Sequence, residues 1–151
     1  MKCIPKMKKN IYIINANYYE EISDRLVGGA KIFLNENNID HEIVNVPGAL
    51  EIPTVVNLIH DKINNDNVDI GFIAIGCVIR GETSHYDIVV NESASGITQL
   101  SLSNNIIITN SILTVENKKQ ALDRSLNDTT NKGYHAAYAC NLLIDIKNGK
   151  F

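Results

Sequence analysis

Short apolar runs alternate with amphipathic segments along most of this chain. The longest run, Val68 to Val78, is almost continuously apolar, which is typical of a strand buried on both faces of a parallel sheet. Three shorter runs predict further strands, at residues 10–14, 39–46 and 105–109. Apolar residues at helical spacing predict helices at residues 22–34, 52–63, 86–100, 116–126 and 130–147.

This alternation predicts an α/β fold. Strands that alternate with helices form parallel sheets with right-handed crossovers and helices on both faces. We therefore expect a three-layer α/β/α sandwich around a four-stranded parallel sheet, whose strand order the pattern does not give. A helical bundle would leave four β-rich runs unexplained.

The chain of 151 residues is long enough for one domain with a full core. We expect that domain at residues 10–151, after a flexible N-terminal segment, residues 1–9, whose lysines are solvated. These lysines are not followed by the apolar stretch of a signal peptide, and no run reaches the ~20 residues of a membrane helix. A cytoplasmic location is therefore predicted.

Charge and cysteine content exclude several classes of protein. The net charge is −3 and there is no basic stripe, which argues against nucleic acid as a partner. The three cysteines, Cys3, Cys77 and Cys140, are widely spaced and odd in number, a pattern that fits neither a disulfide framework nor a metal site. Cys77 and Cys140 are interpreted as small buried hydrophobes.

The most informative segment is Gly76 to Asp87, where the longest apolar run gives way to a helix. Ligands of open α/β sheets bind at such junctions, and a helix N-terminus attracts anions. Gly81, Glu82 and Thr83 offer backbone N–H groups and a hydroxyl to a phosphate, with the Glu82 side chain paired elsewhere, for instance with Arg80. His85 is the histidine best placed to move protons near neutral pH. The simpler alternative is a helix cap, with Ser84 and Asp87 as a capping box and His85 on the surface.

The segments after the other three strands should converge on the same edge. Residues 15–19 include Tyr18 and Tyr19, either of which could stack its ring on a flat ligand, although such aromatics are as often staples. Residues 46–53 combine a bare Gly48-Ala49 backbone with Glu51, which could accept from ligand hydroxyls or simply complement a helix dipole. The fourth segment is residues 110–117.

Two cations, Arg124 and Lys132, flank a polar turn between the last two helices. Arginine suits bidentate binding of phosphate, and lysine adds a compact charge. Helix-end cations that face a dipole are the alternative, and locally the stronger one.

Taken together, these segments resemble the lumazine synthase (6,7-dimethyl-8-ribityllumazine synthase) family. The resemblance rests on blocks in family order from about residue 11 to the last helix. These are residues 29–30, 46–53, 76–87 continued by 91–97, 112–117 with 120–121, and 131–133. No single block is specific, but the combination is.

The resemblance implies a flavodoxin-like fold and a transferase of riboflavin biosynthesis without metal or cofactor. A ribitylamino-pyrimidine condenses with a dihydroxybutanone phosphate, and phosphate and water leave. His85 would relay protons, and Gly81, Glu82, Thr83 and Arg124 would hold the phosphate. The pyrimidine and its ribityl chain would contact Tyr18, Ala49, Leu50, Glu51, Val78, Ile79, Asn110 and Lys132. Tyr18, Tyr19, Asn110 and Ser111 depart from the usual family residues, which affects ring stacking and substrate affinity rather than the reaction.

Family sites are shared between neighbours in a pentameric ring, so Arg124, Lys132 and the Asn110-Ser111 segment would come from the adjacent chain. The resemblance implies a homo-oligomer: a pentamer, a decamer or a larger shell. It also makes riboflavin synthase a candidate partner beside the small-molecule substrates. The competing hypotheses are a non-catalytic flavin- or lumazine-binding or shell-forming protein on this fold, and a flavodoxin-like electron carrier. The second is weak because residues 15–19 lack a hydroxyl-rich phosphate loop.

Overall fold

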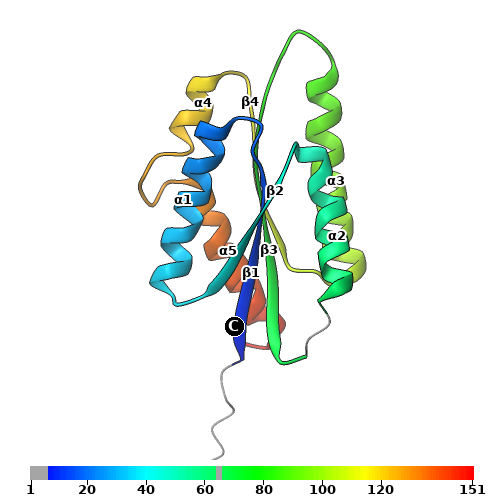
Figure 1. The fold of residues 1–151 in the computed structure, drawn as a ribbon, viewed down its shortest axis with the longest axis vertical. Helices are drawn as coiled ribbons and strands as arrows, with labels where there is room; N and C mark the ends of the chain where they lie inside the picture. Colours follow the sequence, from blue (N-terminus) through cyan, green and yellow to red (C-terminus); the bar gives the residue numbers. More distant parts are fainter. Residues whose placement is uncertain (1–6, 64–65) are drawn as a thin grey trace, which may run out of the picture.

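The computed structural model describes residues 7–63 and 66–151. One parallel sheet lies between two layers of helices (Figure 1), so the predicted three-layer fold is confirmed. The strands are β1 (Lys8–Ala16), β2 (Asp40–Val46), β3 (Val68–Ile79) and β4 (Ile108–Val115). The helices are α1 (Glu20–Glu36), the 3-10 turn η1 (Ala49–Glu51), α2 (Ile52–Lys62), α3 (His85–Asn104), α4 (Lys118–Asp123) and α5 (Lys132–Lys147).

The strand order, β2-β1-β3-β4, places β3 inside the sheet between β1 and β4. From β1 the chain first moves outward to β2 and then returns across β1 to β3 and β4. The connections that leave β1 and β3 therefore diverge to opposite faces, and a crevice opens at the carboxyl ends of these strands. That crevice is where ligands bind in open α/β sheets.

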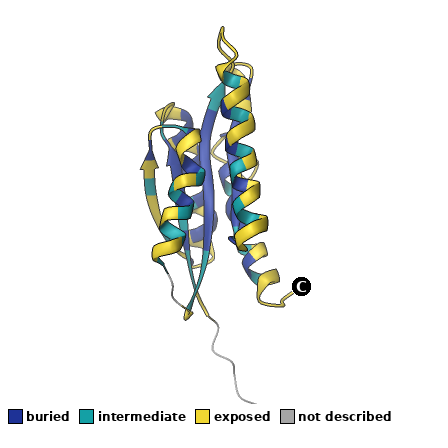
Figure 2. Ribbon diagram, turned by 90° about the vertical axis from the view of Figure 1, so that its right-hand side faces the viewer, coloured by how far each residue is buried: buried dark blue, intermediate teal, exposed yellow. Residues whose placement is uncertain are grey.

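The core is divided into two layers by the sheet. Alternate residues of the strands, such as Ile11 and Ile13, pack under α1 and α5, while Ile14 and Phe72 pack under α2 and α3. Figure 2 shows this arrangement as buried central strands between helices with exposed outer faces. Residues Gly71 to Cys77 of β3 are all buried, as predicted from the continuous apolar run.

The predicted position of the last strand is wrong. It was placed at residues 105–109, but β4 begins at Ile108 and continues to Val115. Its polar residues resemble a loop in sequence, yet Thr109 and Ser111 are buried, and the Thr109 hydroxyl donates to the Ala136 carbonyl over 2.8 Å. Residues 110–115 therefore belong to the strand, and only Glu116 and Asn117 follow it.

The predicted N-terminal boundary is also wrong by two residues. Lys8 and Lys9 belong to β1. The Lys9 side chain is only 10% exposed and its Nζ lies 2.7 Å from Asp145 Oδ1, so it is not a solvated lysine. Residues 1–6 of the predicted flexible segment lie outside the described residues. Within the described ranges, no helix has the length and apolarity needed to cross a bilayer.

Candidate active site

A hollow of about 400 Å³ opens at the carboxyl ends of β1, β2 and β3. We call it the first hollow. It gathers three of the four segments that were expected to converge, because the strands are parallel and end at one edge. Its walls are Tyr18, Tyr19, Pro47, Gly48, Ala49, Leu50, Glu51, Cys77, Val78, Ile79, Gly81, Thr83, His85, Tyr86 and Val89.

Two tyrosines form the wall that follows β1. The Tyr18 and Tyr19 rings meet edge to face, with centroids 5.0 Å apart and an interplanar angle of 79°. Tyr18 is 75% exposed, so its ring faces are accessible to a flat ligand. The sequence left Tyr19 as an alternative to Tyr18 for stacking, and both line the first hollow. Tyr19 supports Tyr18, and its carbonyl accepts from the Ile22 and Ser23 N–H groups at the start of α1.

The segment after β2 presents a mixture of backbone and side chains. Ala49 is buried in the core beneath α2 and α3, so only its backbone is available to a ligand. Leu50 and Glu51 are exposed at the mouth of the first hollow. Glu51 occupies the N-cap position of α2 without a side-chain capping bond, which leaves its carboxylate available as an acceptor.

His85 is the first residue of α3, and the capping box of Ser84 and Asp87, considered as the simpler alternative, does not form. Ser84 occupies the N-cap position with helical dihedrals, and its side chain makes no capping bond. Instead, the His85 N–H donates to Thr83 Oγ1 over 3.4 Å. His85 and Thr83 are exposed and line the first hollow, next to the positive end of the α3 dipole.

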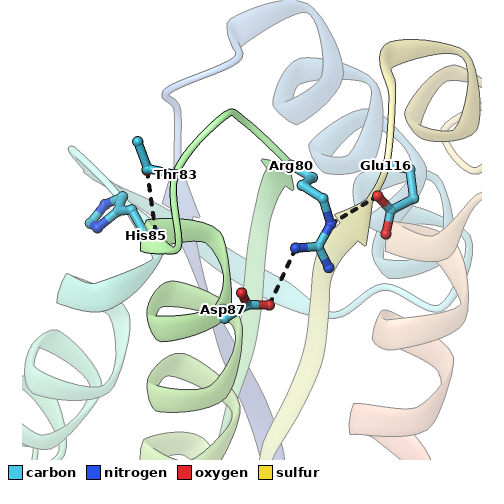
Figure 3. A network of polar contacts seen from close by, with 5 residues as sticks. All are labelled: Arg80, Thr83, His85, Asp87 and Glu116. Atoms are coloured by element: carbon cyan, nitrogen blue, oxygen red, sulfur yellow. Dashed lines mark hydrogen bonds and ion pairs between the residues drawn. The ribbon is translucent and has the colours of Figure 1, made fainter.

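The predicted pairing of Glu82 with Arg80 is also wrong. Arg80 Nε donates to Glu116 Oε2 over 2.9 Å, and Arg80 Nη1 lies 3.4 Å from Asp87 Oδ1 (Figure 3). These bonds raise the pKa of the Arg80 guanidinium, chiefly through Glu116. In the described parts of the chain, the Glu82 carboxylate forms no ion pair within 4 Å and lines neither hollow.

A second hollow, of about 620 Å³, lies along β4 and the turn between α4 and α5. It contains Asn110, Arg124 and Lys132, so one chain does not bring these three predicted residues to the first hollow. His135, which sequence reasoning set aside, also lines this wall. The signal that could have found it is its position three residues after Lys132, on the same helix face. The second hollow is lined by residues 108–115, Arg124, Lys132, His135, Ala136 and Ala139.

Asn131 fixes the turn that carries the two cations. Asn131 is 1% exposed, and its Oδ1 accepts from the Gly133 and Tyr134 N–H groups. Its Nδ2 donates to the Arg25 carbonyl of α1 and to the Leu126 carbonyl. The Lys132 N–H in turn donates to the Arg124 carbonyl over 3.0 Å. The cations therefore share one rigid turn.

Cys77 lines the first hollow but is not an activated nucleophile. The residue is 7% exposed, and burial raises the pKa of its thiol to about 11. Burial also raises the pKa of the Cys140 thiol, to about 12. Both cysteines are free, as predicted, and Cys3 lies outside the described residues. A thiolate is thus scarce near neutral pH at both sites.

Comparison with known proteins gives one consistent result. A family model described as 6,7-dimethyl-8-ribityllumazine synthase matches residues 8–148. A protein of that name from Agrobacterium fabrum is 42% identical over 93% of this chain and 95% of its own length. The one from Bartonella henselae is 43% identical over 93% of this chain and 89% of its own. For 6,7-dimethyl-8-ribityllumazine synthase 1 of Rhizobium meliloti, identity is 41% over 91% of both chains.

Proposed function

The chain belongs to the 6,7-dimethyl-8-ribityllumazine synthase family, and we propose that it catalyses the reaction which that name describes. In this reaction 5-amino-6-(D-ribitylamino)uracil and 3,4-dihydroxy-2-butanone 4-phosphate combine to give 6,7-dimethyl-8-ribityllumazine, phosphate and water. The family match over residues 8–148 carries this proposal. A non-catalytic binding or shell-forming protein is not favoured, because the similar proteins bear the name of the enzyme.

The first hollow is the proposed pyrimidine and ribityl subsite. The exposed Tyr18 ring offers a stacking face, and Tyr19 holds that ring from the side. Acceptors for the ring and ribityl groups come from the backbone of residues 49–51 and from the Glu51 carboxylate, which makes no capping bond to α2. The partly buried Val78 and Ile79 form the apolar floor. A flat, hydroxyl-bearing substrate suits these walls.

The phosphate subsite is assigned to the loop between β3 and α3. Gly81, Glu82 and Thr83 precede the helix N-terminus, whose free N–H groups and dipole favour an anion. Glu82 contributes only its backbone to this subsite, and its unpaired carboxylate takes no part in binding. His85, on the wall of the same hollow, is the proposed proton relay for Schiff-base formation, phosphate elimination and ring closure.

The two hollows are proposed to meet between copies of the chain. Arg124 and Lys132 lie in the second hollow and would complete the phosphate subsite of a neighbour, and Asn110 would adjoin its pyrimidine. A head-to-tail contact of this kind closes into a ring, and we propose a pentamer, alone or within a decamer or shell. Much of the rate acceleration then comes from holding the two substrates together.

The test is to mix purified protein with both substrates and to follow the absorbance and fluorescence of the lumazine product. We expect product to form faster than in the protein-free control. Product formation at the spontaneous rate would overturn the assignment. Saturable flavin binding without turnover would instead support the binding-protein alternative. The mass in solution distinguishes a pentamer from a decamer or a shell.

A further inference from the structure

We propose that Arg80 is a positioning residue: it fixes the loop 81–84 and the first turn of α3, so that the phosphate-binding backbone and His85 keep their alignment. This inference rests on the proposed function. It concerns a cluster that the proposed reaction leaves without a role, formed by Arg80, Asp87 and Glu116 (Figure 3) together with the Tyr86 ring.

Arg80 connects the end of β3 with the start of α3, which is the next element, and with Glu116 after β4, 36 positions further along the chain. Its backbone N–H donates to the Val115 carbonyl over 3.0 Å and extends the β3–β4 pairing by one residue. Its guanidinium reaches Glu116, after β4, and Asp87, in the first turn of α3. The guanidinium carbon also lies 4.2 Å from the centroid of the Tyr86 ring, a cation–π distance. The start of α3 is thus bound to the end of the sheet.

The anchor on the sheet side is itself held in place. The Glu116 N–H donates to Gln120 Oε1 over 2.8 Å, and Asn117 caps α4 by accepting from the Gln120 N–H. Glu116 therefore belongs to an ordered turn rather than to a free surface loop. The charge-assisted bond to Glu116 therefore fixes the orientation of the Arg80 guanidinium.

The loop that Arg80 closes has few other restraints. Ser84 gives α3 no side-chain cap, and the Thr83 hydroxyl accepts only a long bond from the His85 N–H. A Cβ at Gly81 would meet nothing within 4 Å, so the side of the loop on which a side chain would lie is open. The contacts of Arg80 with Asp87 and Tyr86 span the loop from its first residue to the helix and compensate for the missing cap.

Arg80 is not the cation that holds the phosphate. Two carboxylates already balance its charge, and it does not line the first hollow. In Figure 3 the His85 ring points to one side of the start of α3, whereas Arg80, Asp87 and Glu116 lie on the other. The guanidinium therefore acts through the loop and not on the substrate.

The first experiment compares Arg80→Gln with Arg25→Gln in the assembled protein. Arg25 is a matched control: its side chain is 44% exposed against 41% for Arg80, and it pairs with Glu21 on α1, outside both hollows. We expect Arg80→Gln to lower kcat/KM for the phosphate-bearing substrate by roughly tenfold to a hundredfold, because small misplacements of reacting groups cost this much. The KM for the pyrimidine should stay unchanged, Arg80→Lys should recover part of the loss, and Arg25→Gln should match the parent protein.

The second experiment separates positioning from direct binding by the sign of its effect. Glu116→Ala removes a negative charge and frees Arg80. If Arg80 bound phosphate directly, the variant would lower the KM of the phosphate-bearing substrate. Positioning predicts the opposite, a raised KM, in the same direction as Arg80→Gln.

The outcomes are distinguishable. An inactive parent protein would overturn the proposed function before any variant is compared. An active parent with unchanged kinetics in Arg80→Gln, or with a lowered KM in Glu116→Ala, would overturn the positioning role alone. A lowered melting temperature with unchanged kinetic constants would show that Arg80 contributes only to stability, which also overturns it.

Discussion

Gly29 on α1 faces the side chain of Asn131 so closely that a Cβ at position 29 would lie 2.2 Å from Asn131 Oδ1. The absence of a side chain at Gly29 allows α1 to approach the turn before α5. Asn131 can then donate to the Arg25 carbonyl of the same helix over 3.0 Å. The position of Arg124 and Lys132 therefore depends on a glycine of α1, which is distant in sequence but adjacent in space.

Gly29→Ala should destabilise the protein although alanine favours helices. The added methyl must displace the fully hydrogen-bonded Asn131, and overpacking of this kind costs about 1–3 kcal/mol. Gly28→Ala is the matched control, because a Cβ there meets nothing within 4 Å. It should stabilise the protein by about 0.5–1 kcal/mol. Urea unfolding of both variants measures these changes, and equal effects at the two positions would contradict the role of the Gly29–Asn131 contact.

His85→Ala should slow turnover while leaving pyrimidine binding nearly intact. Loss of a positioned proton relay lowers kcat by about 10²–10⁴-fold. The control is His60→Ala on α2, because His60 lies outside both hollows. Steady-state kinetics and a pyrimidine titration measure the two effects separately. Lost pyrimidine binding in His85→Ala would show that the residue has a structural role.

Mixing two inactive variants should restore activity if the hollows act between copies. His85→Ala damages the first hollow and Arg124→Ala damages the second. In an equal, random mixture about a quarter of the junctions join two intact hollows, so about a quarter of the parent activity should return. The variants are unfolded together in urea, refolded and assayed. Recovery is not expected from either variant refolded alone, and an inactive mixture of folded oligomers would contradict a shared site.

Alkylation of Cys77 should require unusually alkaline solution. Burial raises the pKa of its thiol from the ordinary 9.0 to about 11, and only the thiolate reacts. The iodoacetamide rate at Cys77, followed by peptide mass spectrometry, should still rise nearly tenfold between pH 9 and pH 10. A rate that levels off near pH 9 would contradict the burial effect. The folded state favours the neutral thiol, so this group's contribution to stability is intact below pH 9 and is lost as the pH rises toward 11.

The fold was predictable where one physical signal dominated. Val68 to Val78 is apolar on both faces, and β3 extends only one residue beyond it. The same reasoning misplaced β4, because Thr109 and Ser111 are polar and yet buried. The Thr109 hydroxyl is satisfied by the Ala136 carbonyl of α5, and such a long-range bond cannot be read from the pattern of apolar and polar residues.

The candidate site was predictable to the extent that it follows from strand ends. Parallel strands bring their carboxyl ends together, so Tyr18, Glu51 and His85 were expected at one edge and line one hollow. Side-chain partners were not predictable. Arg80 bonds Glu116, 36 positions away, rather than the nearby Glu82. His135 was missed because a histidine inside a helix carries no strand-end signal.

The location of the two hollows on different parts of one chain has a kinetic consequence. If each working site joins two copies, an isolated subunit has no complete site, and dilution below the dissociation constant of the ring should abolish specific activity. Rate per milligram would then rise with enzyme concentration and reach a plateau once association is complete. Catalysis would thus report the assembly equilibrium directly.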